Sequence, residues 1–451
     1  MKAKLQQQNT AHHFQPFSDN KSLAESGARV ITKAKGVYFW DIDGNKYLDG
    51  MAGLWCVNIG YGREELAEVA RKQMTELPYY NLFFQTTTQP AVELAAKIAE
   101  LTPDHLNKVF FTGSGSEAND TNFRMVRRYW DLKGKPNKKT FISRKNAYHG
   151  STVAAASLGG MGYMHEQGDL PIEGIVHIDQ PYWFAEGRDI TPDEFGLKAA
   201  QSLEAKILEI GEENIGAFIA EPFQGAGGVV IPPATYWPEI KRILAKYDIL
   251  FILDEVISGF GRTGEWFACE YFDLKPDLVT IAKGLSSGYI PIGGVIVSDK
   301  VADVLISDGG DFNHGFTYSG HPVAAAVALE NIKLLESEHI VANVKSTTSP
   351  YLQKRWQELA DHPIVGEARG LGMVAAIELV KDKNSCERIE ENSKAGGVCR
   401  DFAIANGLVM RPCGDTMIIS PPLVITISEI DELIEKAKLA LDQTAQHYGI
   451  I

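Results

Sequence analysis

The chain has 451 residues, of which 45% are hydrophobic and 23% are charged, a balance typical of a globular protein long enough for two domains. Its formal net charge of −14 argues against a nucleic acid or an anionic membrane surface as a partner. No apolar run approaches the roughly 18 residues that a membrane-spanning helix needs, and the first residues do not resemble a signal peptide.

The first predicted element is a hairpin. Residues 37–50 alternate apolar and polar side chains around an Asp-Gly pair, a pattern typical of two short antiparallel strands. From about residue 60 to 325, short apolar strands alternate with helical patterns, which predicts a mostly parallel sheet with helices on both faces. The predicted strands cover residues 108–112, 139–143, 174–178, 216–221, 249–255, 278–284 and 293–298.

After about residue 326 the pattern changes. A helix comes first, and short strands follow over 373–380 and 417–424. A closing helix is expected to begin near Ser428, because Thr426 and Glu429 have the spacing of a capping box. We therefore expect a large α/β domain over 60–325 and a smaller α+β domain assembled from 1–59 and 326–451.

Three features should meet beyond the carboxyl ends of the predicted strands, where open α/β sheets bind their ligands. The first is a glycine-rich turn within 112–120, whose free amides suit a phosphate. The second is Asp254 and the third is Lys283, and each directly follows an apolar run. Taken singly, these features are also explained by a tight turn, a helix cap or a structural ion pair. Asp254 and Lys283 are 29 residues apart (283 − 254), close to the roughly 30 residues of a βαβ unit, so both are expected to point into one crevice.

One chemistry uses all three features. A lysine amine that is removed from water has a lowered pKa and forms imines with carbonyl groups. Pyridoxal 5′-phosphate provides an aldehyde for the lysine, a phosphate for the turn, and a ring nitrogen that an aspartate can keep protonated. Lys283, released from the cofactor by a substrate amine, is then placed to move a proton between the substrate Cα and the cofactor. We therefore interpret Lys283 and Asp254 as catalytic residues of a pyridoxal-phosphate enzyme.

Nine motifs along the chain carry a family resemblance through their order and spacing as well as their residues. They are MAGLWCVNIGYG (51–62), YYNLFFQT (79–86), GSGSEAND (113–120), YHGST (148–152), EPFQGAGGV (221–229), DEVISGFGRTG (254–264), AKGLSSGYIPIGG (282–294), HGFTYSGHP (314–322) and GDTMIISPPL (414–423). With these motifs the chain resembles the class III pyridoxal-phosphate-dependent aminotransferases of fold type I, and among them the bacterial ω-aminotransferases. The resemblance runs from about residue 17 to 445.

The resemblance implies a role for each matching residue. The expected cofactor-binding residues are Ser114, Gly115, Ser116, Tyr148, Glu221, Asp254, Val256, Lys283 and Thr317, the last contributed by the neighbouring subunit. The expected substrate-binding residues are Phe17, Trp55, Phe83, Tyr148 and Arg411. In this scheme Asp254 pairs with the ring nitrogen, and Tyr148 and Val256 cover the two faces of the ring. Arg411 pairs with a keto-acid carboxylate and swings away for an uncharged amine substituent.

The activity that the resemblance implies is transamination with ping-pong kinetics. Putrescine is the favoured donor and pyruvate the favoured acceptor, giving an aminoaldehyde and alanine. Cadaverine, other diamines, β-alanine and arylalkylamines are alternative donors, and a decarboxylase or an aminomutase is an alternative activity. The resemblance also implies a homodimer with shared active sites, while a tetramer stays open. The chain departs from common family residues at three positions, which affects pocket shape and rate but not the reaction type: Lys145, Ala147 and Ser258.

Functions outside this family have less support from the sequence. A nucleotide-dependent dehydrogenase needs GxGxxG with an acidic residue about 20 positions on, which the glycine turn lacks. A non-catalytic binding protein would leave Lys283 unmodified. No metal site is expected, because His149 and His321 lie in motifs without an HExxH pattern. The five cysteines are scattered and never form CxxC, which favours a reducing, cytoplasmic compartment.

Overall fold

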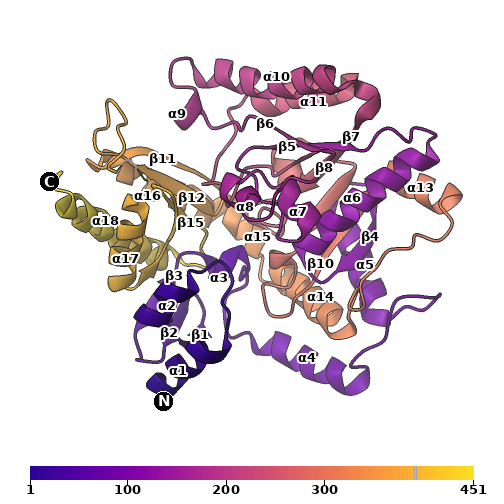
Figure 1. Ribbon diagram of the computed structural model, residues 1–451. Coiled ribbons are helices and arrows are strands. Elements are labelled where there is room, and N and C mark those ends of the chain that lie inside the picture. Colours follow the sequence, from indigo (N-terminus) through magenta and orange to yellow (C-terminus); the bar gives the residue numbers. More distant parts are fainter. Residues whose placement is uncertain (391, 393) are drawn as a thin grey trace.

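The computed structural model describes residues 1–390, 392 and 394–451, and a seven-stranded sheet lies at its centre (Figure 1). The spatial order of the sheet is β4-β10-β9-β8-β7-β5-β6. Strand β10 runs antiparallel to both of its neighbours, and the other pairs are parallel. The strands are β4 (Leu106–Thr112), β5 (Thr140–Arg144), β6 (Ile175–Ile178), β7 (Ile215–Ala220), β8 (Leu250–Asp254), β9 (Leu278–Ile281) and β10 (Gly293–Ser298).

All seven predicted strands are present, and six agree with the prediction within two residues at each end. The seventh, predicted over 278–284, ends at Ile281. It stops there because Lys283 has a positive φ of 42° and begins a short 3₁₀ turn, Lys283–Leu285. A left-handed residue cannot continue an extended strand. The turn therefore lifts the Lys283 side chain out of the sheet.

The central strands are buried on both faces, which explains their continuous apolar sequence. Every residue of β7 and β8 is buried. Alternate residues enter two separate cores: Phe218 and Phe251 belong to one, Ile219 and Ile252 to the other. Helices α10 (Pro192–Ile210) and α11 (Tyr236–Lys246) cover the first face, while α6 (Gly115–Leu132) and α13 (Asp299–Asp308) cover the second (Figure 1).

Two smaller sheets are built from the ends of the chain. One has the order β1-β2-β3-β13 and contains the predicted hairpin, in which β2 (Tyr38–Asp41) and β3 (Lys46–Asp49) are antiparallel. Strand β13 (Leu408–Val409) pairs with β3, so segments from both ends of the chain lie side by side. The other sheet has the order β11-β12-β15-β14. The division into domains of 60–325 and of 1–59 with 326–451 stays a prediction.

The remaining strands and the C-terminal helix mostly follow the sequence patterns. Strand β15 is shorter than the predicted 417–424 because Pro421 and Pro422 follow it, and proline has no N–H for a ladder. Helix α18 (Ile427–His447) begins at the predicted capping box, in which Thr426 and Glu429 bond reciprocally. The strands are β1 (Ile31–Lys35), β11 (Val365–Leu371), β12 (Val374–Leu379), β14 (Arg411–Cys413) and β15 (Thr416–Ile419).

The other helices connect and cover these sheets. They are α1 (Lys2–His12), α2 (Asn20–Ser26), α3 (Ala52–Trp55), α4 (Glu64–Glu76), α5 (Gln89–Leu101), α7 (Val153–Leu158), α8 (Gly162–Glu166), α9 (Trp183–Glu186), α12 (Ala268–Tyr271), α14 (Pro322–Ser337), α15 (Ile340–Asn343), α16 (Ser349–Gln357) and α17 (Ala395–Ala405). Within the described part of the chain, none of the helices is both long enough and apolar enough to cross a membrane.

Candidate active site

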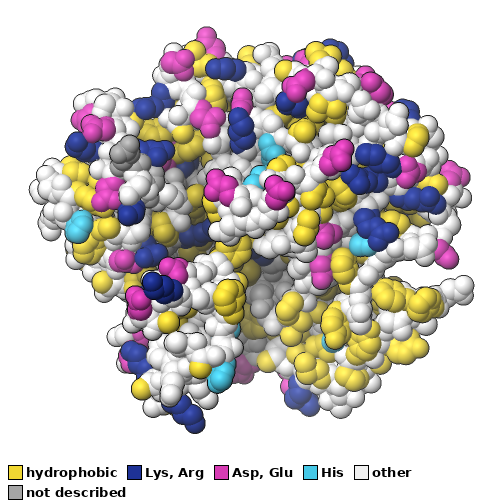
Figure 2. Space-filling model, in the orientation of Figure 1, with side chains coloured by type: hydrophobic (Ala, Val, Ile, Leu, Met, Phe, Trp, Pro, Cys, Tyr) yellow, Lys and Arg dark blue, Asp and Glu magenta, His cyan; other side chains and the backbone are white. Residues whose placement is uncertain are grey.

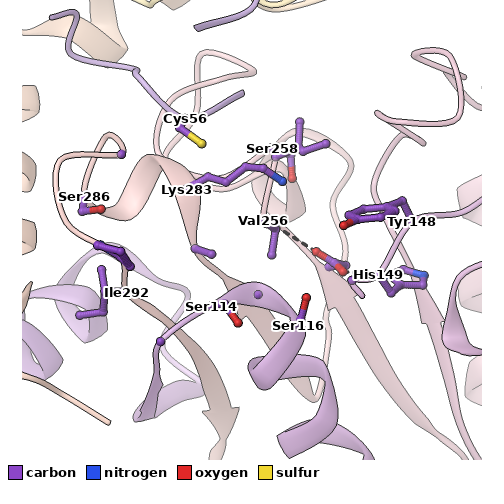
Figure 3. Close-up of a pocket in the computed structure, with 18 of the residues that line it drawn as sticks. Cys56, Ser114, Ser116, Tyr148, His149, Val256, Ser258, Lys283, Ser286 and Ile292 are labelled. Atoms are coloured by element: carbon purple, nitrogen blue, oxygen red, sulfur yellow. Dashed lines mark hydrogen bonds and ion pairs between the residues drawn. The ribbon is translucent and has the colours of Figure 1, made fainter. Parts of the chain in front are cut away.

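A cavity of about 300 Å³ opens where β4, β8 and β9 end, as the sequence predicts. It brings the glycine-rich turn, Asp254 and Lys283 together (Figure 3). The predicted cofactor-binding residues that line it are Ser114, Gly115, Ser116, Tyr148, Glu221, Asp254, Val256 and Lys283. Asp254 and Lys283 therefore line one shared cavity, as the sequence predicts.

The Lys283 side chain extends into this cavity between Cys56 and Val256 (Figure 3). Burial lowers the pKa of its amine, and the positive charge of Arg411 acts in the same direction. The negative charges of Asp254 and Glu221 raise that pKa but do not cancel the effect of burial. A lowered pKa increases the fraction of neutral, nucleophilic amine at a given pH.

Asp254 ends β8 and is held by three donors. Its Oδ2 accepts hydrogen bonds from Asn119 Nδ2 at 2.8 Å and from His149 Nδ1 at 2.8 Å. Its Oδ1 accepts one from the Val256 backbone N–H at 3.1 Å. Only 4% of the residue is exposed, yet it still lines the cavity. The carboxylate is therefore fixed in one orientation, with Oδ1 carrying the fewer donors.

The glycine-rich turn forms the N-terminus of α6, where backbone amides are free and the helix dipole is positive. Ser114 is the N-cap, and its hydroxyl accepts from the Glu117 N–H at 3.2 Å. Gly115 begins the helix in close contact with Val256: a Cβ on this residue would lie 2.9 Å from Val256 Cγ2. Free amides and hydroxyls in this arrangement fit a phosphate.

Glu221 lies deep in the cavity and holds the loop that carries Tyr148. Its Oε1 accepts from the Tyr148 N–H at 3.2 Å, and its Oε2 accepts from the Gly225 N–H at 2.9 Å. Burial raises the pKa of this carboxyl group. The Tyr148 hydroxyl lies 3.1 Å from Ser151 Oγ, and the ring faces the cavity (Figure 3). An aromatic wall and a buried acid therefore flank the space in front of Lys283.

Five predicted residues do not line the cavity within one chain. Trp55 is buried in a hydrophobic cluster with Phe223 and Val374, and Phe17 is 73% exposed. Phe83 packs against Gly315, and the Thr317 carbonyl accepts from the Tyr79 hydroxyl at 2.8 Å. Arg411 is half-buried on β14, close enough for its charge to act on Lys283. The roles assigned to Phe17, Trp55, Phe83, Thr317 and Arg411 stay predictions.

The structure adds three residues to which the sequence had assigned no role at this site: Asn119, His149 and Cys56. Asn119 lies one helical turn after Gly115, so the two share a face of α6, and this spacing was the available signal. His149 was expected not to bind a metal and had no other predicted role, and in the structure it bonds Asp254. Cys56 lines the cavity beside Lys283 (Figure 3). No cluster of three or more His, Cys, Asp or Glu side chains with a metal-binding arrangement occurs among the described residues.

Comparisons with known proteins agree with this geometry. The family described as "Aminotransferase class-III" matches residues 22–441. A putrescine–pyruvate aminotransferase of Pseudomonas aeruginosa is 67% identical over 96% of this chain and 95% of its own. The omega transaminase of Pseudomonas jessenii, solved in complex with PMP, has a TM-score of 0.97 at 40% identity, with 99% of both chains covered. An (S)-enantioselective omega-transaminase from Thermomicrobium roseum has a TM-score of 0.95 at 44% identity, with 98% of both chains covered.

Proposed function

This chain belongs to the class-III aminotransferases, and from that premise we propose that it transfers an amino group from an aliphatic diamine, with putrescine as the preferred donor, to pyruvate. The family, the fold class and the enzyme class predicted from the sequence are confirmed, and the enzyme uses pyridoxal 5′-phosphate. The products of the proposed reaction are an aminoaldehyde and alanine. The observation that carries the proposal is the 67% identity, over 96% of the chain, to an enzyme named for this substrate pair.

The residues around the cavity fit the cofactor. When bound, pyridoxal 5′-phosphate supplies an aldehyde for the amino group and a protonated ring that accepts an electron pair. The free amides of the α6 N-terminus would hold its phosphate, and Asp254 would face its ring nitrogen. Lys283, with its lowered pKa, would take the proton from the substrate Cα and deliver it to the cofactor.

Arg411 provides the means to bind two different substrates in turn. A guanidinium pairs with the carboxylate of pyruvate through two parallel hydrogen bonds. Arg411 forms no ion pair within the described part of the chain, so its charge is free for a substrate. A diamine has no carboxylate, and a guanidinium near the surface can turn towards water when that substrate binds. A rigid buried arginine would instead be left unpaired, at a cost on the order of 3–5 kcal/mol.

A homodimer with shared active sites is part of the proposal. Aromatic side chains are exposed near Thr317: Tyr79, Tyr80, Phe84 and Tyr318, of which Phe84 is 91% exposed. Hydrophobic side chains also gather in Figure 2 at the lower right of the molecule, around α4 and the loop that follows it. A second copy that covers this surface would bring Thr317 and Phe83 to its cavity. The scattered, unpaired cysteines support a cytoplasmic location.

The test is a panel of amine donors with pyruvate as acceptor and alanine formation as the readout. Putrescine is expected to give the highest kcat/KM, followed by cadaverine and then by β-alanine, γ-aminobutyrate and an arylalkylamine. The Lys283→Ala variant is the control and should form no alanine above background. Activity on β-alanine or arylalkylamines with none on any diamine would eliminate the proposed donor while leaving the family assignment intact.

A further inference from the structure

A cluster of buried polar side chains is bonded to Asp254 but is not among the residues that line the cavity. It consists of Asn119 and Asn122 on α6 and Thr280 on β9, and all three are fully buried. The hydrophobic core beside them includes Ala118 of α6 and Ile252 of β8. Buried polar groups are costly unless they are bonded to one another, so the arrangement of their bonds is informative.

The Asn119 amide is held in one orientation by four partners. Its Nδ2 donates to Asp254 Oδ2 at 2.8 Å and to the His149 carbonyl at 2.7 Å. Its Oδ1 accepts from Thr280 Oγ1 at 2.8 Å and from Asn122 Nδ2 at 3.1 Å. Turning the amide over would place its oxygen against the Asp254 carboxylate and its nitrogen against two donors. The Asp254 carboxylate and the His149 carbonyl on one side, and Thr280 and Asn122 on the other, therefore fix which group Asn119 presents to Asp254.

The Thr280 hydroxyl is oriented in the same way. It accepts from Asn122 Nδ2 at 2.7 Å and so must direct its own proton to Asn119 Oδ1. The bonds thus run in one direction, from Asn122 through Thr280 and Asn119 to Asp254. Hydrogen bonds aligned in series polarise one another. The last donor in the series meets the charged oxygen, where hydrogen bonds are strongest.

We propose that Asn119 and Thr280 are positioning residues that turn Asp254 Oδ1 towards the ring nitrogen of the cofactor. Asn119, which Thr280 holds through its Oδ1, engages Oδ2 together with His149. These bonds leave Oδ1 with one neutral donor, the Val256 N–H. The inference rests on the proposed pairing of Asp254 with that nitrogen. Gly115 and Asn119 lie one turn apart on α6, so a single helix sets the position of both the phosphate end and the nitrogen end of the site.

The experiment compares two ligands that differ only at the ring nitrogen: pyridoxal 5′-phosphate and its carbocyclic analogue, in which that nitrogen is replaced by CH. Each enzyme is stripped of cofactor and reconstituted with either ligand, and both dissociation constants are measured. The variants are Thr280→Val, which keeps the side-chain shape, and Asn119→Leu. The matched control is Thr444→Val, because Thr444 is also buried but its hydroxyl bonds elsewhere in the fold, to Ala440 O in α18 and to Cys399 in α17.

The wild-type enzyme and the Thr444→Val control should bind the natural cofactor more tightly than the analogue. Asn119→Leu should reduce this preference about tenfold and Thr280→Val about threefold, each through weaker binding of the natural cofactor alone. Equal weakening of both ligands, or an unchanged preference, would overturn the positioning role. If the wild-type enzyme itself shows no preference, the pairing of Asp254 with the ring nitrogen fails first. If Asn119→Leu does not fold, the Thr280→Val result decides.

Discussion

Gly115 is a position at which one methyl group should directly disturb cofactor binding. A Cβ there would lie 2.9 Å from Val256 Cγ2, 3.4 Å from Val256 Cγ1 and 3.6 Å from Ala282 Cβ. Carbon atoms in contact prefer about 3.5–4.0 Å, so the first distance is too short by roughly 0.6–1.1 Å. Val256 is β-branched and has few alternative rotamers, so the loop after β8 must shift. Overpacking of this kind costs about 1–3 kcal/mol.

Because Val256 lines the cavity, we expect Gly115→Ala to weaken the affinity for pyridoxal 5′-phosphate by about 10- to 100-fold, the factor that corresponds to roughly that cost. The measurement is a fluorescence titration of the apoenzyme, with urea unfolding to follow its stability. Gly162→Ala is the matched control, because Gly162 also begins a helix but has open space around its Cβ position.

A double variant makes the steric explanation specific. Val256→Ala removes both of the Val256 methyl groups that the new Cβ would meet, so Gly115→Ala should cost less in that background. The reasoning is refuted if Gly115→Ala behaves like Gly162→Ala. It is also refuted if the effects of Gly115→Ala and Val256→Ala simply add.

Three further changes follow from the site and its support. In the folded apoenzyme burial lowers the pKa of the Lys283 amine from 10.5, so the unfolded chain binds more protons and the free energy of unfolding rises with pH. Lys283→Met should therefore stabilise the apoenzyme in urea unfolding, with a gain that shrinks as the pH rises towards 10.5. A gain that does not depend on pH would contradict this. Arg411→Met should lower kcat/KM of the pyruvate half-reaction at least about tenfold in stopped-flow measurements, while kcat/KM of the putrescine half-reaction should change by less than about threefold. Equal losses in the two half-reactions would contradict the role of Arg411. Thr426→Ala should cost about 1 kcal/mol of unfolding free energy by opening the capping box of α18, whereas an unchanged denaturation midpoint would show that the cap contributes nothing.

The core of the fold could be predicted because its strands are short, apolar and separated by helical patterns. In β7 and β8 every residue is buried, so the sequence carries a continuous apolar signal that periodicity detects. The exact end of a strand was harder to predict from the sequence. The prediction ran β9 on to residue 284 because Ala282 continues the apolar run and Lys283 follows it directly, and nothing in the composition reveals that Lys283 adopts a positive φ. That conformation is imposed by the surrounding structure, not by local preference.

The site could be predicted where a residue and the residues around it belong to the same chain. Asp254 and Lys283 follow apolar runs, and the glycine-rich turn precedes a helix, so topology alone brings the three together. Asn119 lies within the GSGSEAND motif but had no predicted role, because its role depends on a partner 135 residues away in the sequence. Thr317 is a different case. Its predicted role needs a second subunit, and no pattern within one chain specifies what covers its exposed aromatic side chains.

Several features of this site work against the stability of the fold. Lys283 combines a positive φ, which costs on the order of 1–3 kcal/mol, with an amine whose charged form is disfavoured by burial. Asp254 buries a carboxylate that requires three donors to satisfy it. Asp254 ends β8 and Lys283 comes two residues after the end of β9, and both strands are fully buried in the central sheet. A residue on a mobile loop would relax such strain by moving. Placing the fixed carboxylate at the end of β8 and the strained lysine just after β9 keeps them in one cavity, and this preorganisation is what the chemistry requires.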